Sequence, residues 1–110
     1  PLGIAAFDAA GNILWANDAM LAMHGTTRDE LARTGASLAR ATLQELDGTP
    51  IPDAQRPSRL ALTKGITVNG RDARVLIEGK TAPAEVSITA VPLKDEHGNT
   101  DGVLIIHQDI

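Results

Sequence analysis

The sequence predicts an α+β domain in which a five-stranded antiparallel sheet carries several short helices on one face. Three observations lead to this prediction. Two short apolar segments flank a glycine turn near the start of the chain, helix caps and prolines occupy its middle, and three apolar or alternating segments fill its last third. Strands at both ends of a chain, separated by helices, favour an antiparallel sheet with the helices segregated to one side.

Length and composition fit a single globular domain. The chain has 110 residues, of which 43% are apolar and 22% charged, and its formal net charge is -4. These are ordinary values for a soluble domain. Only 2% of the residues are aromatic, namely Phe7 and Trp15, and Cys is absent. A disulfide framework and a thiol nucleophile are therefore excluded, and the scarcity of rings argues against nucleic-acid binding.

The first third of the chain begins with a predicted hairpin. Gly3 to Asp8 and Ile13 to Ala16 are two short apolar strands, and the segment 9–12 contains the glycine of the turn between them. Asn17 is a favourable N-cap for a helix over residues 18–23, because its side chain can accept hydrogen bonds from the first turn. The hairpin therefore leads directly into a short helix.

Two further helices are predicted before the prolines. Thr27 and Glu30 form a capping box, so a brief helix is expected to run from here to about Gly35. A third helix is predicted over Ser37 to Leu46, where leucines alternate with polar residues at nearly helical spacing. Both helices would lie before the glycine and prolines of the segment 47–53, which form a turn and an extended linker.

The second half returns to strands after one more helix. Pro57 suits the first position of a helix that ends at Gly65. Strands are predicted over the segment 73–78 and over the segment 85–91, where alternation places Val86, Ile88 and Ala90 on one face and Pro92 ends the strand. The segment 103–106 is apolar at every position, which is typical of a central strand.

Taken in order, these motifs resemble those of a PAS domain, the bacterial sensor module. The resemblance covers almost the whole chain and rests on five pieces: Phe7-Asp8-x-x-Gly11-x-Ile13-Leu14-x-Ala16-Asn17, then Gly25 with Arg28-x-Glu30-Leu31, then Leu46-Asp47-Gly48-x-Pro50-x-Pro52, then Pro92-Leu93-x-Asp95-x-x-Gly98, and finally Gly102 to Ile106 with Asp109-Ile110.

The resemblance implies a PAS fold whose cavity, between sheet and helices, holds a cofactor, a metabolite or only side chains. It also implies a regulatory domain without catalysis of its own. Such a domain relays signals to an attached output module, for which a histidine kinase is the first candidate. A cyclic-dinucleotide enzyme and an anti-sigma-pathway phosphatase are the others. The chain starts at Pro1 without Met and stops after a strand. We therefore interpret residues 1–110 as one PAS domain excised from a longer signalling protein.

A cavity would be lined by the inward positions of the predicted elements. Alternation and the resemblance together give fourteen candidates: Ala5, Phe7, Ala16, Met20, His24, Leu38, Leu43, Leu60, Val75, Ile77, Val86, Ile88, Leu104 and Ile106. Small alanine side chains leave room inside, which favours a small apolar ligand such as a fatty acid. The alternative is a filled core in a module that acts only in dimerisation and relay.

The polar residues give few further sites. His24 either faces the cavity or is satisfied structurally at its helix end, and His107 is expected to be structural. Arg56 and Arg59 flank the start of the last predicted helix, and they are either surface charges or, for one of the two, a contact for an acidic head group at the cavity mouth. No spacing of the histidines predicts a metal site. The resemblance also disfavours haem and flavin, because the helix over 57–64 has no His and a flavin-reactive Cys is missing.

Partners and location complete the sequence-based predictions. If Ala16 faces the cavity, Trp15 points to the opposite side of the sheet and forms an apolar patch with strand residues there. We expect a homodimer or flanking-helix contact through this outer face, and relay positions at Trp15, Val91, Val103, Ile105, Asp109 and Ile110. No apolar segment reaches the roughly 18–20 residues of a membrane span. The sequence thus predicts a cytoplasmic domain without membrane contact or nucleic-acid partner.

Overall fold

A computed structural model describes residues 2–34, 41–77 and 82–110 of the chain. Its strands are β1 (Leu2–Asp8), β2 (Ile13–Ala16), β3 (Thr42–Gln44), β4 (Val68–Leu76), β5 (Ala84–Lys94) and β6 (Thr100–Asp109). Its helical elements are α1 (Asp18–Met23), α2 (Arg28–Thr34), the 3-10 turn η2 (Asp53–Gln55) and α3 (Pro57–Lys64).

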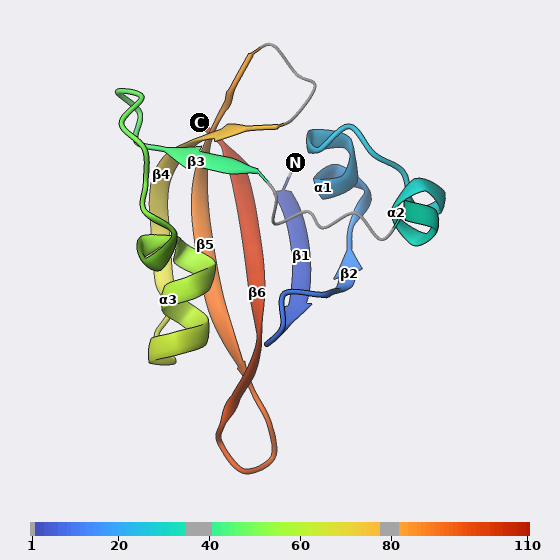
Figure 1. Ribbon diagram of the computed structural model, residues 1–110, viewed down its shortest axis with the longest axis vertical. Helices are drawn as coiled ribbons and strands as arrows, with labels where there is room; N and C mark the ends of the chain where they lie inside the picture. The colour runs from blue at the N-terminus through green and yellow to red at the C-terminus, as the bar shows by residue number, and fades with distance from the viewer. Residues whose placement is uncertain (1, 35–40, 78–81) are drawn as a thin grey trace.

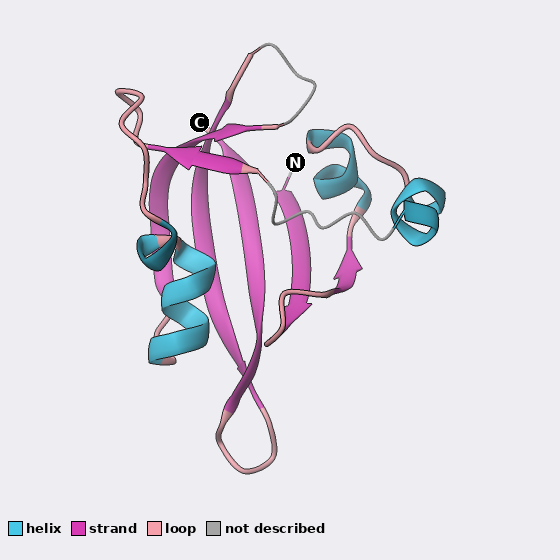
Figure 2. Cartoon of the chain, viewed as in Figure 1, coloured by secondary structure: helices cyan, strands magenta, loops and turns pink. Residues whose placement is uncertain are grey.

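The strands form one antiparallel sheet in the order β2-β1-β6-β5-β4-β3. Figure 1 shows β6 and β5 in the middle of this sheet, with α3 on one side of the view and α1 and α2 on the other. In Figure 2 the helices stand out against the sheet as short separate segments. The predicted α+β class is confirmed. The sheet has one strand more than predicted, because β3 adds to the edge of β4.

Two hairpins of the sheet close with the same turn sequence, Asp-x-x-Gly-Asn. In the β1–β2 turn the Asp8 Oδ1 accepts hydrogen bonds from the backbone N–H groups of Ala10 and Asn12, at 3.0 and 2.8 Å. In the β5–β6 turn Asp95 does the same for His97 and Asn99, at 2.8 and 2.9 Å. An Asp that bonds its own turn in this way fixes the hairpin locally. Both turns predicted from the sequence are confirmed.

The predicted cap of α1 is confirmed and has a second role. The Asn17 Oδ1 accepts from the backbone N–H of Met20 at 2.9 Å, which caps α1, and from that of Ile4 at 3.0 Å. The Asn17 Nδ2 donates to the Leu2 carbonyl oxygen at 2.9 Å. One side chain therefore joins the start of α1 to β1, and α1 is held over the sheet from its first turn.

The helix predicted over 37–46 is wrong where the structure can be compared with it. Residues 35–40, including the cavity candidate Leu38, lie outside the described residues. Residues 42–44 form β3, which pairs with β4 so that Leu43 lies opposite Val75. The Ile51 N–H donates to the Leu43 carbonyl oxygen at 3.1 Å after the chain has turned at Gly48. These long-range hydrogen bonds outweigh the weak helical spacing of the leucines.

The helix predicted from Pro57 is confirmed as α3. Pro57 occupies its first turn, and Gly65 ends it with φ +64°, a left-handed conformation that glycine adopts readily. Ala61 and Pro57 are buried, and α3 packs against β5 and β6. This contact brings the first turn of α3 close to the middle of the sheet.

The strand predicted to end at Pro92 is longer than expected. β5 continues to Lys94, and Pro92 pairs with Val103 of β6. The last pairing between β4 and β5 is Val68 with Ala90, so beyond that point β5 has only β6 as a neighbour. The N–H that proline lacks is therefore not needed for a second ladder.

A bulge reverses the faces predicted for β6. The β5–β6 register shifts by one residue between Leu93 and Lys94, and beyond it Ala90 pairs with Ile105. A one-residue shift moves every side chain of a strand to the other face. Val103 and Ile105 are consequently buried on the helix-covered face, whereas Leu104 and Ile106 are half-buried on the outer face. The prediction had these two pairs exchanged.

The core fills the space between the sheet and its helices. Its buried apolar residues come from both ends of the chain: Ala5, Phe7, Ala16, Met20, Leu21, Ala41, Leu43, Ile51, Ala61, Ala73, Val75, Val86, Ile88, Ala90, Val103 and Ile105. Six of these sixteen are alanines. Small side chains at so many inner positions set the conditions for an internal space.

Candidate ligand cavity

A cavity of about 90 Å³ lies between the helix-covered face of the sheet and the first turn of α3. Most of its wall is apolar, and three basic side chains and one hydroxyl add polar atoms. The lining residues are Phe7, Gly11, Met20, His24, Ala41, Leu43, Arg56, Pro57, Ser58, Leu62, Ile88, Val103, Ile105 and His107. An apolar wall with a few convergent polar groups is the usual form of a small-molecule site.

His107 is the most buried polar side chain of the cavity, with 9% of its surface exposed. It lies on β6 between Gly3 of β1 and Ile88 of β5. Among the residues that the structure describes, none hydrogen-bonds the His107 ring. The ring stacks on His24, which ends α1, with ring centroids 6.2 Å apart and planes inclined by 30°. Two imidazoles from opposite ends of the chain therefore meet at the cavity.

The protonation of His107 is shifted strongly by these surroundings. Burial, followed by the neighbouring His24 and Arg56, lowers the pKa of His107 to about 4. A buried imidazole resists protonation because the charged form loses its hydration, and nearby cations add to the penalty. His107 is therefore a neutral ring near pH 7, able to accept a hydrogen bond at one nitrogen and donate from the other.

Arg56 brings a permanent positive charge to the same cavity. It precedes α3 as its N-cap residue, and its Nη1 donates to the Ala41 carbonyl oxygen at 2.9 Å. Burial lowers the pKa of the guanidinium, Asp53 raises it and Arg59 lowers it. An arginine stays protonated throughout the physiological range. The half-buried guanidinium is thus a fixed cation beside two titratable rings.

The first turn of α3 adds to this positive end of the cavity. Pro57 and Ser58 line the cavity, and the Arg56 side chain makes no capping hydrogen bond to the turn. The start of a helix carries partial positive charge from its backbone N–H groups. Chemically, the cavity therefore offers an aliphatic space that ends at a cationic wall.

The structure brings part of the predicted cavity set together. Five of the fourteen candidates line the cavity, namely Phe7, Met20, His24, Leu43 and Ile88. Four others lie in the surrounding core without lining it, namely Ala5, Ala16, Val75 and Val86. These nine positions all belong to the buried interior or its polar border.

The remaining candidates lie elsewhere. Leu60 and Ile77 are half-buried and do not line the cavity. On α3 the cavity is reached by Leu62 and Ser58, which are four residues apart and share a helix face, whereas Leu60 is on another. Leu104 and Ile106 point to the outer face because of the β-bulge.

Sequence reasoning missed His107 as a cavity residue and placed Val103 and Ile105 at the outer face. His107 could have been assigned to the cavity from its pairing with the inward-facing Ile88, but that pairing follows only once the bulge is known. The composition of 103–106 gave no help, since all four residues are apolar. Arg56 and Arg59 were both considered for the cavity mouth, and of the two only Arg56 is among the residues that line the cavity.

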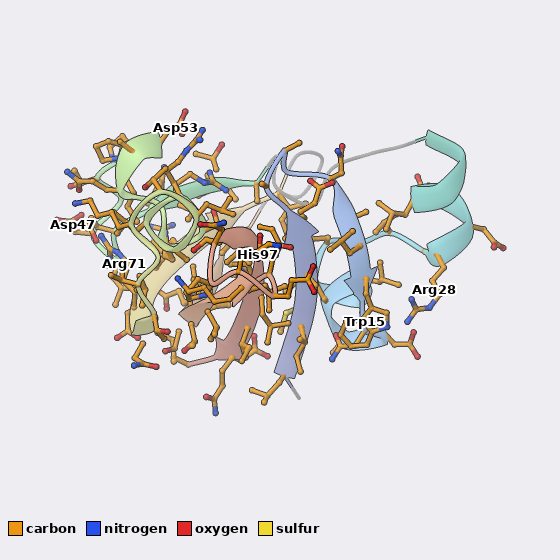
Figure 3. The ribbon with its side chains drawn as sticks, turned by 90° about the horizontal axis from the view of Figure 1, so that it is seen from below. Trp15, Arg28, Asp47, Asp53, Arg71 and His97 are labelled. Carbon is orange, nitrogen blue, oxygen red and sulfur yellow. The ribbon has the colours of Figure 1, made fainter. Side chains whose placement is uncertain are left out.

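The outer face of the sheet carries an apolar strip. Trp15 of β2 is 50% exposed and pairs with Ala6 of β1. Ala6 also pairs with Leu104 of β6, and Leu104 pairs with Val91 of β5, so these four residues form a row across the sheet. Figure 3 shows Trp15 and Arg28 on the side of the molecule formed by β2 and α2, opposite Asp47, Asp53 and Arg71. Asp109 and Ile110 are exposed at the end of β6.

In the described part of the chain no three His, Cys, Asp or Glu side chains gather as a metal site would require. No helix in residues 2–34, 41–77 and 82–110 is long and apolar enough to cross a membrane.

Comparison with solved structures gives the same fold from several sources. The PAS domain of nitrogen regulation protein NR(II) from Vibrio parahaemolyticus is 16% identical, with a TM-score of 0.66 over 99% of this chain and 89% of that one. The dark structure of the blue-light photoreceptor Aureochrome1 LOV is 20% identical, with a TM-score of 0.70 over 98% and 75%. The light-state dimer of the fungal photoreceptor Vivid is 19% identical, with a TM-score of 0.65 over 98% and 77%.

Sequence comparison agrees with the structural one. No curated protein shows significant similarity to the chain. The family model described as the PAS fold, however, matches residues 1–110. The strand order, the helices on one face and the cavity beneath them are consistent with this match. The chain therefore belongs to the PAS family of sensory domains.

Proposed function

We propose that this PAS domain senses a small, largely apolar ligand in the cavity and relays its binding to an attached output module. The observation that carries the proposal is the cavity itself, whose lining is mostly apolar and includes the neighbouring side chains His24, His107 and Arg56. A core without a ligand role would be expected to close over such a space, because protein interiors are close-packed. Catalysis is assigned to the output module, and a histidine kinase remains its first candidate.

Cavity size limits the ligand. One water molecule requires about 10–15 Å³ of cavity volume, and a non-hydrogen atom of a ligand is of similar size. A cavity of about 90 Å³ therefore accommodates a ligand of roughly six to nine non-hydrogen atoms. A long-chain fatty acid exceeds this limit, whereas a fatty-acid-like molecule with a short chain fits. Large ring cofactors fit poorly, since pockets for drug-sized ligands typically measure about 300–1,000 Å³. The chain also lacks the Cys of a flavin-photoreactive site.

The relay is proposed to run along β6. His107, Ile105 and Val103 contact the cavity, and Asp109 follows His107 by two residues at the strand's end. A ligand that displaces the His107 ring would therefore act on the C-terminal end of β6. Cytoplasmic location and a homodimer through the outer sheet face belong to the same proposal. The Vivid dimer supports dimerisation as a property of related folds.

Calorimetry with C4 to C8 alcohols, amides and carboxylates tests the ligand proposal. Each compound is titrated into the wild type and into Ala41→Leu, which adds three carbon atoms to the cavity lining. Ala22→Leu is the matched control, since Ala22 is exposed on α1. We expect saturable binding that Ala41→Leu weakens at least tenfold and Ala22→Leu leaves unchanged. Absence of saturable binding to the wild type by every compound would favour the alternative, a PAS module for dimerisation and relay alone.

A further inference from the structure

We infer that the cavity takes a short-chain carboxylate, seated with its head group between Arg56 and the His24–His107 pair and its alkyl chain among the apolar residues. The inference rests on the proposed ligand-binding function and names the chemical class of the ligand. It requires three things of the structure: a cationic end, an aliphatic remainder and a length that matches.

The cationic end is built from separate parts of the chain. Arg56 comes from the start of α3, His24 from the end of α1 and His107 from β6, and all three line one cavity. Both histidine and arginine side chains donate hydrogen bonds to carboxylates, and the donation is stronger when the group is charged. The first turn of α3 contributes further positive potential through Pro57 and Ser58.

Acidic groups around this end are sparse among the described residues. Arg56 interacts electrostatically with Asp53 of η2 and with Arg59 of α3. The charged groups that affect His107 are His24 of α1 and Arg56. The cavity lining itself contains no Asp or Glu among the described residues. The described side chains that line this end therefore carry a net positive charge, which favours an anion over a neutral or cationic ligand.

The rest of the wall fits an alkyl chain. Met20, Leu43, Ile88, Val103 and Ile105 supply aliphatic contacts. By the transfer of small molecules from water, each buried methylene group should raise the affinity of the ligand about fourfold. The volume allows about six to nine non-hydrogen atoms, so butyrate to heptanoate fit and palmitate does not.

Binding should be linked to proton uptake. In the free protein His107 is neutral because of its burial and because of the neighbouring His24 and Arg56. A carboxylate beside the ring favours the protonated imidazole and partly offsets both effects. A proton is then taken up with the ligand, and affinity rises as pH falls, by at most about tenfold per pH unit.

The test compares sodium hexanoate with hexanamide, a neutral molecule of nearly the same shape, by calorimetry at pH 6.0 and 8.0. We expect hexanoate to bind the wild type at least tenfold more tightly than hexanamide at pH 6.0. Its affinity should fall about two- to fourfold at pH 8.0, while hexanamide affinity stays constant. This comparison uses only the wild type, so it does not depend on the folding of any variant.

Variants then assign the head-group position. Arg56→Gln should weaken hexanoate at least tenfold and leave hexanamide within twofold, whereas Arg59→Gln, at an exposed site on α3, should affect neither. Equal affinities for hexanoate and hexanamide, or pH-independent hexanoate binding, would overturn the carboxylate inference and leave the ligand proposal standing. If hexanoate, hexanamide and the other C4 to C8 probes all fail to bind, the carboxylate inference and the ligand proposal are both overturned.

Discussion

His107 is the residue whose surroundings differ most from those that its type prefers. It is 9% exposed, and its ring faces His24 and Arg56 within a mostly apolar cavity. A histidine in a strand would ordinarily be satisfied by a hydrogen bond or by water. His107 lies on β6, which is both a central strand of the sheet and the last strand of the chain. A ligand that contacts His107 would therefore act on the end of β6 outside the cavity.

Burial of His107 predicts a loss of stability in mild acid. The unfolded imidazole takes up a proton near pH 6.5, whereas the folded one resists it down to a pKa of about 4. The unfolded state thus binds more protons in this window, so the free energy of unfolding decreases as pH falls from 6.5 toward 4. We expect this residue to account for up to about 2 kcal/mol between pH 6.5 and 5.0.

Urea unfolding of the wild type and His107→Gln across that pH range measures this contribution. The variant should lose distinctly less stability than the wild type over the same pH interval. His97→Gln is the matched control, because His97 is an exposed residue of the β5–β6 turn, and it should follow the wild type. Parallel pH profiles for the wild type and His107→Gln would contradict the buried, neutral imidazole.

Asn17 predicts a second effect at the residue scale. Its side chain accepts from Met20 and Ile4 and donates to Leu2, so Asn17→Ala removes a helix cap and two links to β1. Loss of a cap costs about 1 kcal/mol, the part-buried hydrogen bond from Ile4 adds about the same, and the exposed one to Leu2 adds less. We expect a destabilisation of about 2–3 kcal/mol in denaturant unfolding. Asn12→Ala, which removes one exposed side-chain bond to Asp8, should cost under about 0.5 kcal/mol.

The elements show which parts of the fold local sequence determines. The β1–β2 and β5–β6 turns, the cap of α1 and the ends of α3 are set by residues that lie close to one another in sequence. These features were predicted correctly because Asp and Asn side chains there hydrogen-bond the neighbouring backbone, while Pro and Gly favour the local backbone angles. Much of the hairpin and helix arrangement was therefore accessible from the sequence alone.

Features that depend on long-range register were not accessible. β3 forms because Leu43 pairs with Val75, a partner far along the chain. The faces of β6 depend on the bulge at Leu93 and Lys94, and the four apolar residues 103–106 carry no alternation that would reveal it. For the same reason His107 was not assigned to the candidate cavity, although five of the predicted lining residues do lie there.

Gly102 yields a prediction for the packing of β6 against β1. A Cβ added at this residue would lie 2.5 Å from the Phe7 carbonyl oxygen, a backbone atom that cannot move independently. Gly102→Ala should therefore separate β6 from β1 locally and destabilise the domain by about 1–3 kcal/mol. Thermal unfolding measures this, with Asp101→Ala at the adjacent exposed position as control. Equal melting temperatures for the two variants would contradict the close approach of these strands.

At the scale of the whole molecule, the two faces of the sheet have different proposed roles. The inner face holds the cavity, and the outer face presents Trp15 with the half-buried Leu104 and Val91. An apolar strip on an open sheet face is a favourable contact for a second protomer. β6 contributes alternate side chains to both faces, so a ligand on one side and a partner on the other would contact the same strand.

Dimerisation through the outer face predicts a specific effect of Trp15. Truncation to Trp15→Ala removes the largest exposed side chain of the strip and should raise the dimer dissociation constant at least tenfold, as expected for an aromatic interface residue. Sedimentation equilibrium measures the constant. Leu46→Ala, at an exposed apolar residue beside β3, should leave it unchanged. An unaltered constant for Trp15→Ala would show that the protomers associate elsewhere.

Ligand binding in the cavity and its transmission along β6 can be followed together in an NMR titration of the wild type with sodium hexanoate at pH 6.0, through the backbone and methyl signals. We expect saturable shifts at the cavity residues Ile88, Ile105 and His107, which extend along β6 to Asp109 while the signals of Leu46 stay constant. Shifts confined to exposed residues, or no saturable shift at any concentration of hexanoate and the other C4 to C8 probes, would contradict binding in the cavity and relay through β6.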